Sequence, residues 1–286
     1  MKQESAAKRR FWPAVATAVL MATAAGGTAV LAGCSGHDGT SPAAATSSAS
    51  EHGQAQSAQA NKPEHSPGPG GSNPAGSRSW AWCTSGPSGT WNTSDGFDLY
   101  NNKWNSEGNP GPQQICGNSG RDWQVTSTQR AGNTAVLTYP SVQKNYPNRA
   151  LSSFTSMTSS YAENMNAVAG TDAEAAYDIW INDLNKEVMF WVDNHGQTPA
   201  GSKVATVTLG GLTWDYYEDS DYYTFVLDHN ATSGTVDLLA GIKYLISRGD
   251  LSASDKLWQV NFGFEICSTA GAAETFTVSN FTLASS

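Results

Sequence analysis

The stretch Glu187-Val188-Met189-Phe190-Trp191-Val192 separates into two distinct sets when every second residue is taken. Side chains of a β-strand point alternately to the two faces of a sheet, so the even-numbered residues (Val, Phe, Val) share one face. This face is wholly apolar and suits a hydrophobic core. The odd-numbered residues place a carboxylate, a thioether and an indole on the other face. The stretch therefore predicts a strand with one buried face and one face that is available for chemistry.

A second stretch repeats this pattern at Val260-Asn261-Phe262-Gly263-Phe264-Glu265-Ile266-Cys267. Its even-numbered residues are apolar, whereas Glu265 lies on the other face. A carboxylate in an apolar strand costs several kcal/mol unless it is paired or functional. Glu187 and Glu265 are therefore either two independent structural carboxylates or a catalytic pair, and their pattern alone leaves both readings open.

Alternation with period two continues through most of the chain after residue 122. It predicts strands at residues 123–127, 134–139, 153–159, 176–181, 187–192, 204–209, 222–227, 257–266 and 275–283. One segment has helical spacing instead, with Thr235 as its N-cap and Gly249 after its end; its apolar residues are Val236, Leu238, Leu239, Ile242, Leu245 and Ile246. These elements predict an all-β fold, a β-jelly roll sandwich with a concave substrate cleft and one helix packed outside.

Composition supports this fold class and excludes one class of partner. The 286-residue chain has 10 Trp, 10 Tyr and 28 Gly but only 14% charged residues, which is typical of aromatic, turn-rich β-structure. Its formal net charge of −9 argues against binding to nucleic acid.

Residues 1–33 have the features of a targeting segment. Basic residues precede an apolar stretch at 11–30, and Leu31-Ala32-Gly33-Cys34 follows. The pattern resembles a bacterial lipoprotein signal that is cut before Cys34, which then carries lipid. An ordinary secretory signal and an uncleaved anchor helix are the alternatives. All three place the remainder outside the cytoplasm, and we expect membrane contact only through the N-terminal lipid anchor.

Residues 34–77 are predicted to be a disordered Ser/Ala/Gly/Pro linker. Residues 35–77 contain no Ile, Leu, Val, Met, Phe, Trp or Tyr, so no apolar surface offsets the entropy of ordering. His37, His52 and His65 are expected to be solvated here rather than to bind metal. The folded domain is therefore residues 78–286, and we expect it to be a monomer.

Three cysteines remain after the targeting segment. Cys83 and Cys116 lie in two early strand-like segments that a turn-rich loop separates, and we expect them to form a disulfide. Cys267 is left as a free thiol, expected to be buried and inert.

Several short motifs together resemble glycoside hydrolase family 12. They are, in order, Ala176-Tyr177-Asp178-Ile179-Trp180, Glu187-Val188-Met189-Phe190-Trp191, Pro199-Ala200-Gly201-Ser202 and Phe262-Gly263-Phe264-Glu265. Asn101-Asn102-Lys103-Trp104 and Tyr139-Pro140 are supporting matches. The resemblance covers residues 78–286 and implies a β-jelly roll that hydrolyses β-1,4-glucans with retention, among them cellulose, mixed-linkage glucan and xyloglucan. No cofactor or metal is required by this chemistry.

The resemblance also implies roles for individual residues. Glu187 would be the nucleophile, Glu265 the general acid and then base, and Asp178 would orient the nucleophile. A surface aspartate is the alternative for Asp178. Retention requires carboxyl groups about 5 to 5.5 Å apart, which strands of one curved sheet can supply. Repulsion across that distance would keep Glu187 ionised and Glu265 protonated near neutral pH.

Substrate contacts follow from the same resemblance. Asn102, Trp104 and Trp191 match positions that contact sugar, and Met189 would line the floor of the cleft. A place in the core is the alternative for Trp104. The remaining aromatic candidates, Trp82 and Trp123, are expected to pack in the core rather than to extend the cleft, and the loop histidines His195 and His229 are assigned no catalytic role.

Two positions depart from the family pattern. Ile266-Cys267 follows the second glutamate where an aromatic ending is usual, and Asn105 replaces the usual Gly after Trp104. We therefore expect an altered subsite beside an intact catalytic pair.

The sequence thus predicts a secreted, lipid-anchored endo-β-glucanase at the cell surface. A non-catalytic carbohydrate-binding lipoprotein that uses the same cleft is the alternative, which the presence of both glutamates argues against. A family 11 xylanase differs in the strand around the first glutamate, and a family 16 laminarinase requires a Glu-x-Asp-x-(x)-Glu strand that the sequence lacks.

Overall fold

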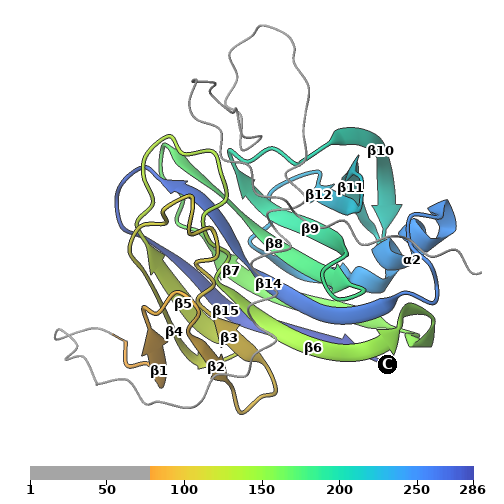
Figure 1. Ribbon diagram of the computed structural model, residues 1–286, viewed down its shortest axis with the longest axis horizontal. Helices are drawn as coiled ribbons and strands as arrows, with labels where there is room; N and C mark the ends of the chain where they lie inside the picture. The colour runs from red at the N-terminus through yellow and green to blue at the C-terminus, as the bar shows by residue number, and fades with distance from the viewer. Residues whose placement is uncertain (1–77) are drawn as a thin grey trace, which may run out of the picture. The chain divides into compact units, whose positions relative to one another are not determined.

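A computed structural model describes residues 78–286, which form two packed β-sheets (Figure 1). One sheet has six strands in the order β1-β4-β5-β15-β7-β13, with bounds Trp82–Thr84, Gln113–Ser119, Asp122–Ser127, Glu274–Ser285, Met157–Asn164 and Ser233–Asp237. The other has nine strands in the order β10-β11-β12-β9-β8-β14-β6-β3-β2, with bounds Ser202–Leu209, Leu212–Asp219, Tyr222–Leu227, Lys186–His195, Thr171–Ile181, Lys256–Thr269, Ser141–Ala150, Asp98–Tyr100 and Thr90–Asn92. The all-β sandwich prediction is confirmed.

The predicted targeting segment, the linker and Cys34 lie outside the described residues. Within residues 78–286, no helix is both long and apolar enough to cross a membrane.

Strand pairing in the nine-stranded sheet is antiparallel with one exception. β12 lies parallel to β9, so that Tyr222 is opposite Glu187 and Val226 is opposite Trp191. The chain reaches this position by leaving β9, forming β10 and β11, and returning as β12 (Figure 1). Gly210 and Gly211, both at positive φ (59° and 84°), make the tight turn between β10 and β11.

The core lies between the two sheets, on the faces that the alternation predicted. Val188 and Phe190 of β9 are 0% exposed. Phe262 of β14 packs on Tyr177 of β8 at a ring-centroid distance of 4.7 Å and stacks on Phe281 of β15 at 5.7 Å, which joins the two sheets. Each such buried side chain contributes about 1.5 to 3 kcal/mol through removal of apolar surface from water.

Two tryptophans were predicted to pack in the core. Trp123 is 0% exposed and meets Phe264 edge to face at 5.6 Å, which confirms its place there. Trp82 is half-buried and stacks on Trp91 at 5.7 Å, and both pack against the main core cluster.

Among residues 78–286 there is one α-helix, α2, Leu238–Arg248. Its N-cap is Asp237, whose side chain accepts a hydrogen bond from Ala240 N at 3.0 Å, so the prediction of Thr235 was wrong. The reason is that residues 233–237 pair with β7 as strand β13, which keeps the chain extended up to Asp237. Gly249 caps the C-terminus at φ 92°, as predicted. Gly241 lets the helix approach the core, because a Cβ there would lie 2.3 Å from Phe190.

A second prediction was also wrong. Residues 134–139 form no strand, and only Thr138 makes an isolated bridge, to Ile266. The polar groups of this segment bind outside a strand ladder instead: Ala135 O accepts from Asn133 Nδ2 at 2.6 Å, and Thr138 Oγ1 donates to Asn102 O, in a distant loop, at 2.9 Å. The predicted strand at residues 153–159 begins later, at Met157, after a short 3-10 turn at Leu151–Ser153.

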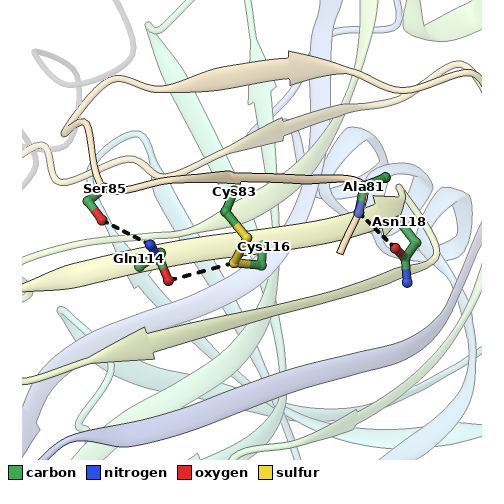
Figure 2. The surroundings of a disulfide bond; sticks show 6 residues. All are labelled: Ala81, Cys83, Ser85, Gln114, Cys116 and Asn118. Carbon is green, nitrogen blue, oxygen red and sulfur yellow. Dashed lines mark hydrogen bonds between the residues drawn. A yellow bond between two sulfur atoms is a disulfide. The ribbon is translucent and has the colours of Figure 1, made fainter. Parts of the chain in front are cut away.

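The Cys83–Cys116 disulfide is confirmed (Figure 2). The two cysteines lie directly opposite each other on β1 and β4. Ala81 N donates to Asn118 Oδ1 at 3.0 Å, and Gln114 Nε2 donates to Ser85 Oγ at 3.4 Å on either side of the bridge (Figure 2). The disulfide therefore fastens the short edge strand β1 to the six-stranded sheet.

Candidate active site

Three neighbouring strands of the nine-stranded sheet carry the predicted catalytic residues. Asp178 lies on β8, Glu187 on β9 and Glu265 on β14, with β8 between the other two. Alternation places all three on the face opposite the core. They are nevertheless only 3%, 4% and 4% exposed, so each carboxylate is largely removed from water.

The register places the two glutamates at different heights along β8. Glu187 lies opposite Trp180, whereas Glu265 lies opposite Glu174. Their carboxyl groups nevertheless act on the same two phenols. Burial raises the pKa of Tyr222 most, and the negative charges of Glu187 and Glu265 raise it further.

Tyr139 precedes β6, whereas Tyr222 lies on β12, and these two strands flank β9, β8 and β14. The pKa of Tyr139 is raised by burial and by the same carboxylates. Burial raises its pKa well above the usual value, and the charges of Asp178, Glu265, Glu174 and Glu187 add to this in that order. The Tyr139 hydroxyl itself donates to Ala176 O of β8 at 3.0 Å. These four carboxylates all lie on the three neighbouring strands β8, β9 and β14.

Asp178 is held by an aromatic neighbour on its own strand. Trp180 Nε1 donates a hydrogen bond of 2.8 Å to Asp178 Oδ2. Burial at 3% exposure excludes the surface alternative for this residue. The indole N–H favours the ionised carboxylate and fixes its rotamer.

Met189 forms the centre of a small apolar cluster beneath the carboxylates. Its Sδ accepts hydrogen bonds from Tyr222 Oη at 2.7 Å and from Trp191 Nε1 at 3.4 Å. These three residues and Ala176 form a cluster that is separate from the main core. Trp191 is 2% exposed, and its indole N–H is directed at the sulfur.

The remaining predicted contact residues lie in the loop after β3. Asn102 adopts φ 34°, is 1% exposed, and its Oδ1 has no hydrogen-bond partner in the structure. Trp104 is half-buried. Asn105 explains one departure from the family pattern: its side chain accepts from Gly108 N at 2.7 Å and donates to Val136 O at 2.9 Å, which ties two loops together.

Sequence reasoning missed several residues of this face. Glu174 is 0% exposed and lies directly opposite Glu265. It lies four residues before Asp178 in the same strand, a spacing that places both side chains on one face and could have identified Glu174 as a site residue. Asn261 is 0% exposed, lies opposite Asp178, and its side-chain amide has no partner in the structure. Gln197 reaches Glu265 from a loop, a contact that no local pattern could reveal.

His195 was predicted to lie in a loop but is the last residue of strand β9, whereas His229 lies in the loop after β12. His195 Nε2 is 3.3 Å from Asp193 Oδ1, and exposed His229 contacts its neighbour Asp228.

Structural comparison shows where this fold occurs. The xyloglucanase domain of NopAA from Sinorhizobium fredii, solved in complex with cellobiose, matches with a TM-score of 0.65 and 25% identity, over 72% of this chain and 99% of that chain. The family 12 xyloglucanase from Bacillus licheniformis matches with a TM-score of 0.64 and 23% identity, over 72% of this chain and 100% of that one. The fold and the match to the family model of glycosyl hydrolases over residues 95–285 together make this chain a glycoside hydrolase.

Sequence comparison then gives the family. The sequence model of glycosyl hydrolase family 12 matches residues 95–285, and the chain belongs to this family. Xyloglucan-specific endo-beta-1,4-glucanase A from Emericella nidulans is 29% identical over 215 residues, which cover 68% of this chain and 89% of that protein. A probable enzyme of the same name from Aspergillus flavus is 30% identical over 219 residues, covering 68% and 88%.

Proposed function

We propose that this protein is an endo-acting, retaining β-1,4-glucanase whose preferred polymer is xyloglucan. The observation that carries the proposal is that Glu187 and Glu265, each only 4% exposed, lie on the same face of the sheet, on the two strands β9 and β14 that flank β8. Xyloglucan is the choice among β-1,4-glucans because the relatives from Emericella nidulans and Aspergillus flavus and both structural neighbours carry that polymer in their names. Cellulose-like and mixed-linkage glucans are the poorer substrates in this proposal.

In the proposed reaction, Glu187 attacks the anomeric carbon while the glycosidic C–O bond breaks. Glu265 gives its proton to the departing oxygen, and a glycosyl ester forms on Glu187. Water then attacks the anomeric carbon, loses a proton to Glu265 and releases Glu187. The anomeric configuration is retained because it is inverted twice.

Local charges support this division of roles. Glu265 lies opposite a third buried carboxylate, Glu174, whereas Glu187 lies opposite the neutral Trp180. A nearby negative charge favours the protonated form of a carboxyl group, as a general acid requires. Asp178, fixed by the Trp180 indole, would orient the Glu187 carboxylate.

The sugar would be bound by the polar and aromatic side chains around the carboxylates. Buried Asn102 offers an unpartnered Oδ1 to a hydroxyl group, and half-buried Trp104 offers a ring to a pyranose face. The apolar floor of Met189 and Trp191 would lie beneath the ring next to the bond that is cut.

Reducing-sugar release by the purified protein tests this proposal on xyloglucan, mixed-linkage glucan, carboxymethyl cellulose and xylan. Glu187→Gln and Glu265→Gln should each lower the rate by about 10²- to 10⁴-fold, because each removes a group that acts in the transition state. Glu107→Gln, an exposed substitution, is the matched control. Proton NMR of the first product should show the β-anomer. Tight polymer binding without any hydrolysis would instead indicate a carbohydrate-binding lipoprotein.

We also propose that the protein acts outside the cytoplasm, tethered through lipidated Cys34 and the linker of residues 34–77. The support is the Leu31-Ala32-Gly33-Cys34 motif and the apolar stretch before it. Fractionation of a bacterial host tests the anchor. The wild-type protein should partition with membranes, and Cys34→Ala should not carry lipid in mass spectra. Equal lipid-free recovery of both proteins would contradict the anchor.

A further inference from the structure

A buried glutamine joins the free cysteine to the proposed acid/base. Gln197 lies in the loop between β9 and β10, and its Nε2 donates to Glu265 Oε2 at 3.2 Å. The Cys267 thiol donates to Oε1 of the same amide at 2.7 Å. Gln197, Cys267 and Glu265 are 7%, 0% and 4% exposed. We call these three side chains the Gln197 bridge.

The fold fixes the glutamine end of the Gln197 bridge through its backbone. Asn194 Oδ1 accepts from Gln197 N at 3.0 Å, and Asn194 Nδ2 donates to Gln197 O at 2.9 Å. Asn194 is held in turn by Asn230, whose Nδ2 donates to Asn194 O at 2.9 Å. Two hydrogen bonds from the Asn194 side chain therefore hold the Gln197 backbone in place, and this fixes where its side chain begins.

The cysteine end is fixed by an irregularity in β14. The register with β8 shifts between Ile266 and Ser268, so that Cys267 is the extra residue of a β-bulge. Asn133 Nδ2 donates to Cys267 O at 2.7 Å and stabilises this position. The bulge places the thiol beside Gln197, two residues after Glu265 on the same strand.

We propose that Gln197 is a positioning residue for Glu265 and that the Cys267 thiol sets the orientation of its amide. This inference rests on the proposed role of Glu265 as the acid/base. A thiol is a donor toward a carbonyl oxygen, so it selects the amide rotamer in which Nε2 faces Glu265. The flipped amide would place its N–H₂ group against the S–H donor and would lose both hydrogen bonds.

This orientation decides which oxygen of Glu265 carries the proton. Because Oε2 accepts from Gln197 and a carbonyl oxygen accepts better than a hydroxyl oxygen, this hydrogen bond favours the proton on Oε1. When Glu265 has given up its proton to the leaving group, the Gln197 N–H stabilises the resulting anion. The Gln197 bridge thus orients the acid and limits how tightly Glu265 holds its proton.

Other titratable groups near Glu265 favour its protonated form, the opposite of the effect of Gln197. Negative charges around Glu265 favour its protonated form, and the donor from Gln197 opposes them. The titratable groups that face this region are Glu174 and Asp178 of β8, Glu187 of β9, Tyr222 of β12, Tyr139 before β6, and Cys267 of β14.

The test is the pH dependence of kcat/KM on xyloglucan for the full-length protein. Gln197→Met removes the donor at similar size, so the alkaline limb should move upward by about one pH unit. Cys267→Ala frees the amide to rotate and should move the limb in the same direction by less. Cys267→Ser keeps a donor and should bring the limb back toward that of wild type. Gln114→Met is the matched control, an exposed glutamine beside a sulfur on the other sheet.

A second measurement needs no turnover. Carbon-13 NMR of Glu-labelled protein follows the Glu265 carboxyl, assigned by its loss in Glu265→Gln, and its titration midpoint should rise in Gln197→Met. An unchanged midpoint, or a rate loss without movement of the alkaline limb, would overturn the inference. If the wild-type protein shows no hydrolysis, the proposed function fails, while the NMR titration still decides whether Gln197 acts on Glu265.

Discussion

Replacing Glu163 by glutamine should stabilise the protein, and increasingly so as the pH rises. Glu163 lies on β7, is 6% exposed, and its side chain points into the sandwich. Burial raises its pKa to about 9 from the usual 4.5, with further increases from the charge of Asp193 and a hydrogen bond with Asp193. The folded protein therefore keeps a proton on Glu163 that the unfolded chain releases above pH 4.5.

The sign and size of the effect follow from this difference. Stability linked to Glu163 is fully present below pH 4.5 and is lost progressively as the pH rises to about 9. Each pH unit in that window costs about 1.4 kcal/mol, which amounts to roughly 4 kcal/mol at pH 7.5. Glutamine does not titrate, and its amide can donate to Asp193 as the protonated carboxyl group does. We expect Glu163→Gln to match wild type near pH 4.5 and to exceed it by about 4 to 5 kcal/mol at pH 8.

Urea unfolding, followed by tryptophan fluorescence at pH 4.5, 6.5 and 8, measures the difference. Glu107→Gln, which changes an exposed glutamate, should show no pH-dependent gain. A gain from Glu163→Gln that is equal at all three pH values, or a loss at pH 8, would refute the reasoning.

Two further predictions concern local stability. Replacing Cys83 and Cys116 together by serine opens a loop with a sequence separation of 33 and should lower the free energy of unfolding by about 3 to 4 kcal/mol, as read from urea midpoints; an unchanged midpoint would show that β1 contributes little. Asp237→Ala removes the N-cap of α2 and should cost about 1 kcal/mol, whereas Thr235→Ala, at the position the sequence favoured, should cost less in the same assay.

The strands that pattern reasoning predicted best are those with two distinct faces. β8, β9 and β14 each bury one apolar face and direct polar residues away from it, so period two is visible in the sequence. β6, Ser141–Ala150, was missed because its residues are mostly polar and include Pro147. Its pairing with β14 and β3 makes it a strand, and such partners lie far away in the sequence.

In the candidate site, too, local pattern predicted some residues and missed others. The faces of Glu187, Glu265 and Asp178 follow from alternation, and their burial agrees with it. The opposition of Glu174 to Glu265 depends on the register between β8 and β14, which a single strand does not encode. Gln197 depends on a loop conformation, and the thiol beside it on a bulge. Tertiary pairing, rather than local preference, decided each of these.

The single parallel ladder between β9 and β12 has a consequence for how the molecule opens. β10, β11 and β12 form one antiparallel meander, and only the β12 edge joins it to the rest of its sheet. The meander can therefore undock as a cooperative unit while the β8–β9 and β8–β14 pairings persist. Because Tyr222 to Val226 pair with Glu187 to Trp191, the strand of the proposed nucleophile is the border of this unit. In amide hydrogen exchange, the amides of β12 should lose protection together and before those of β8. The opening would then occur along the edge of β9, the strand that carries Glu187.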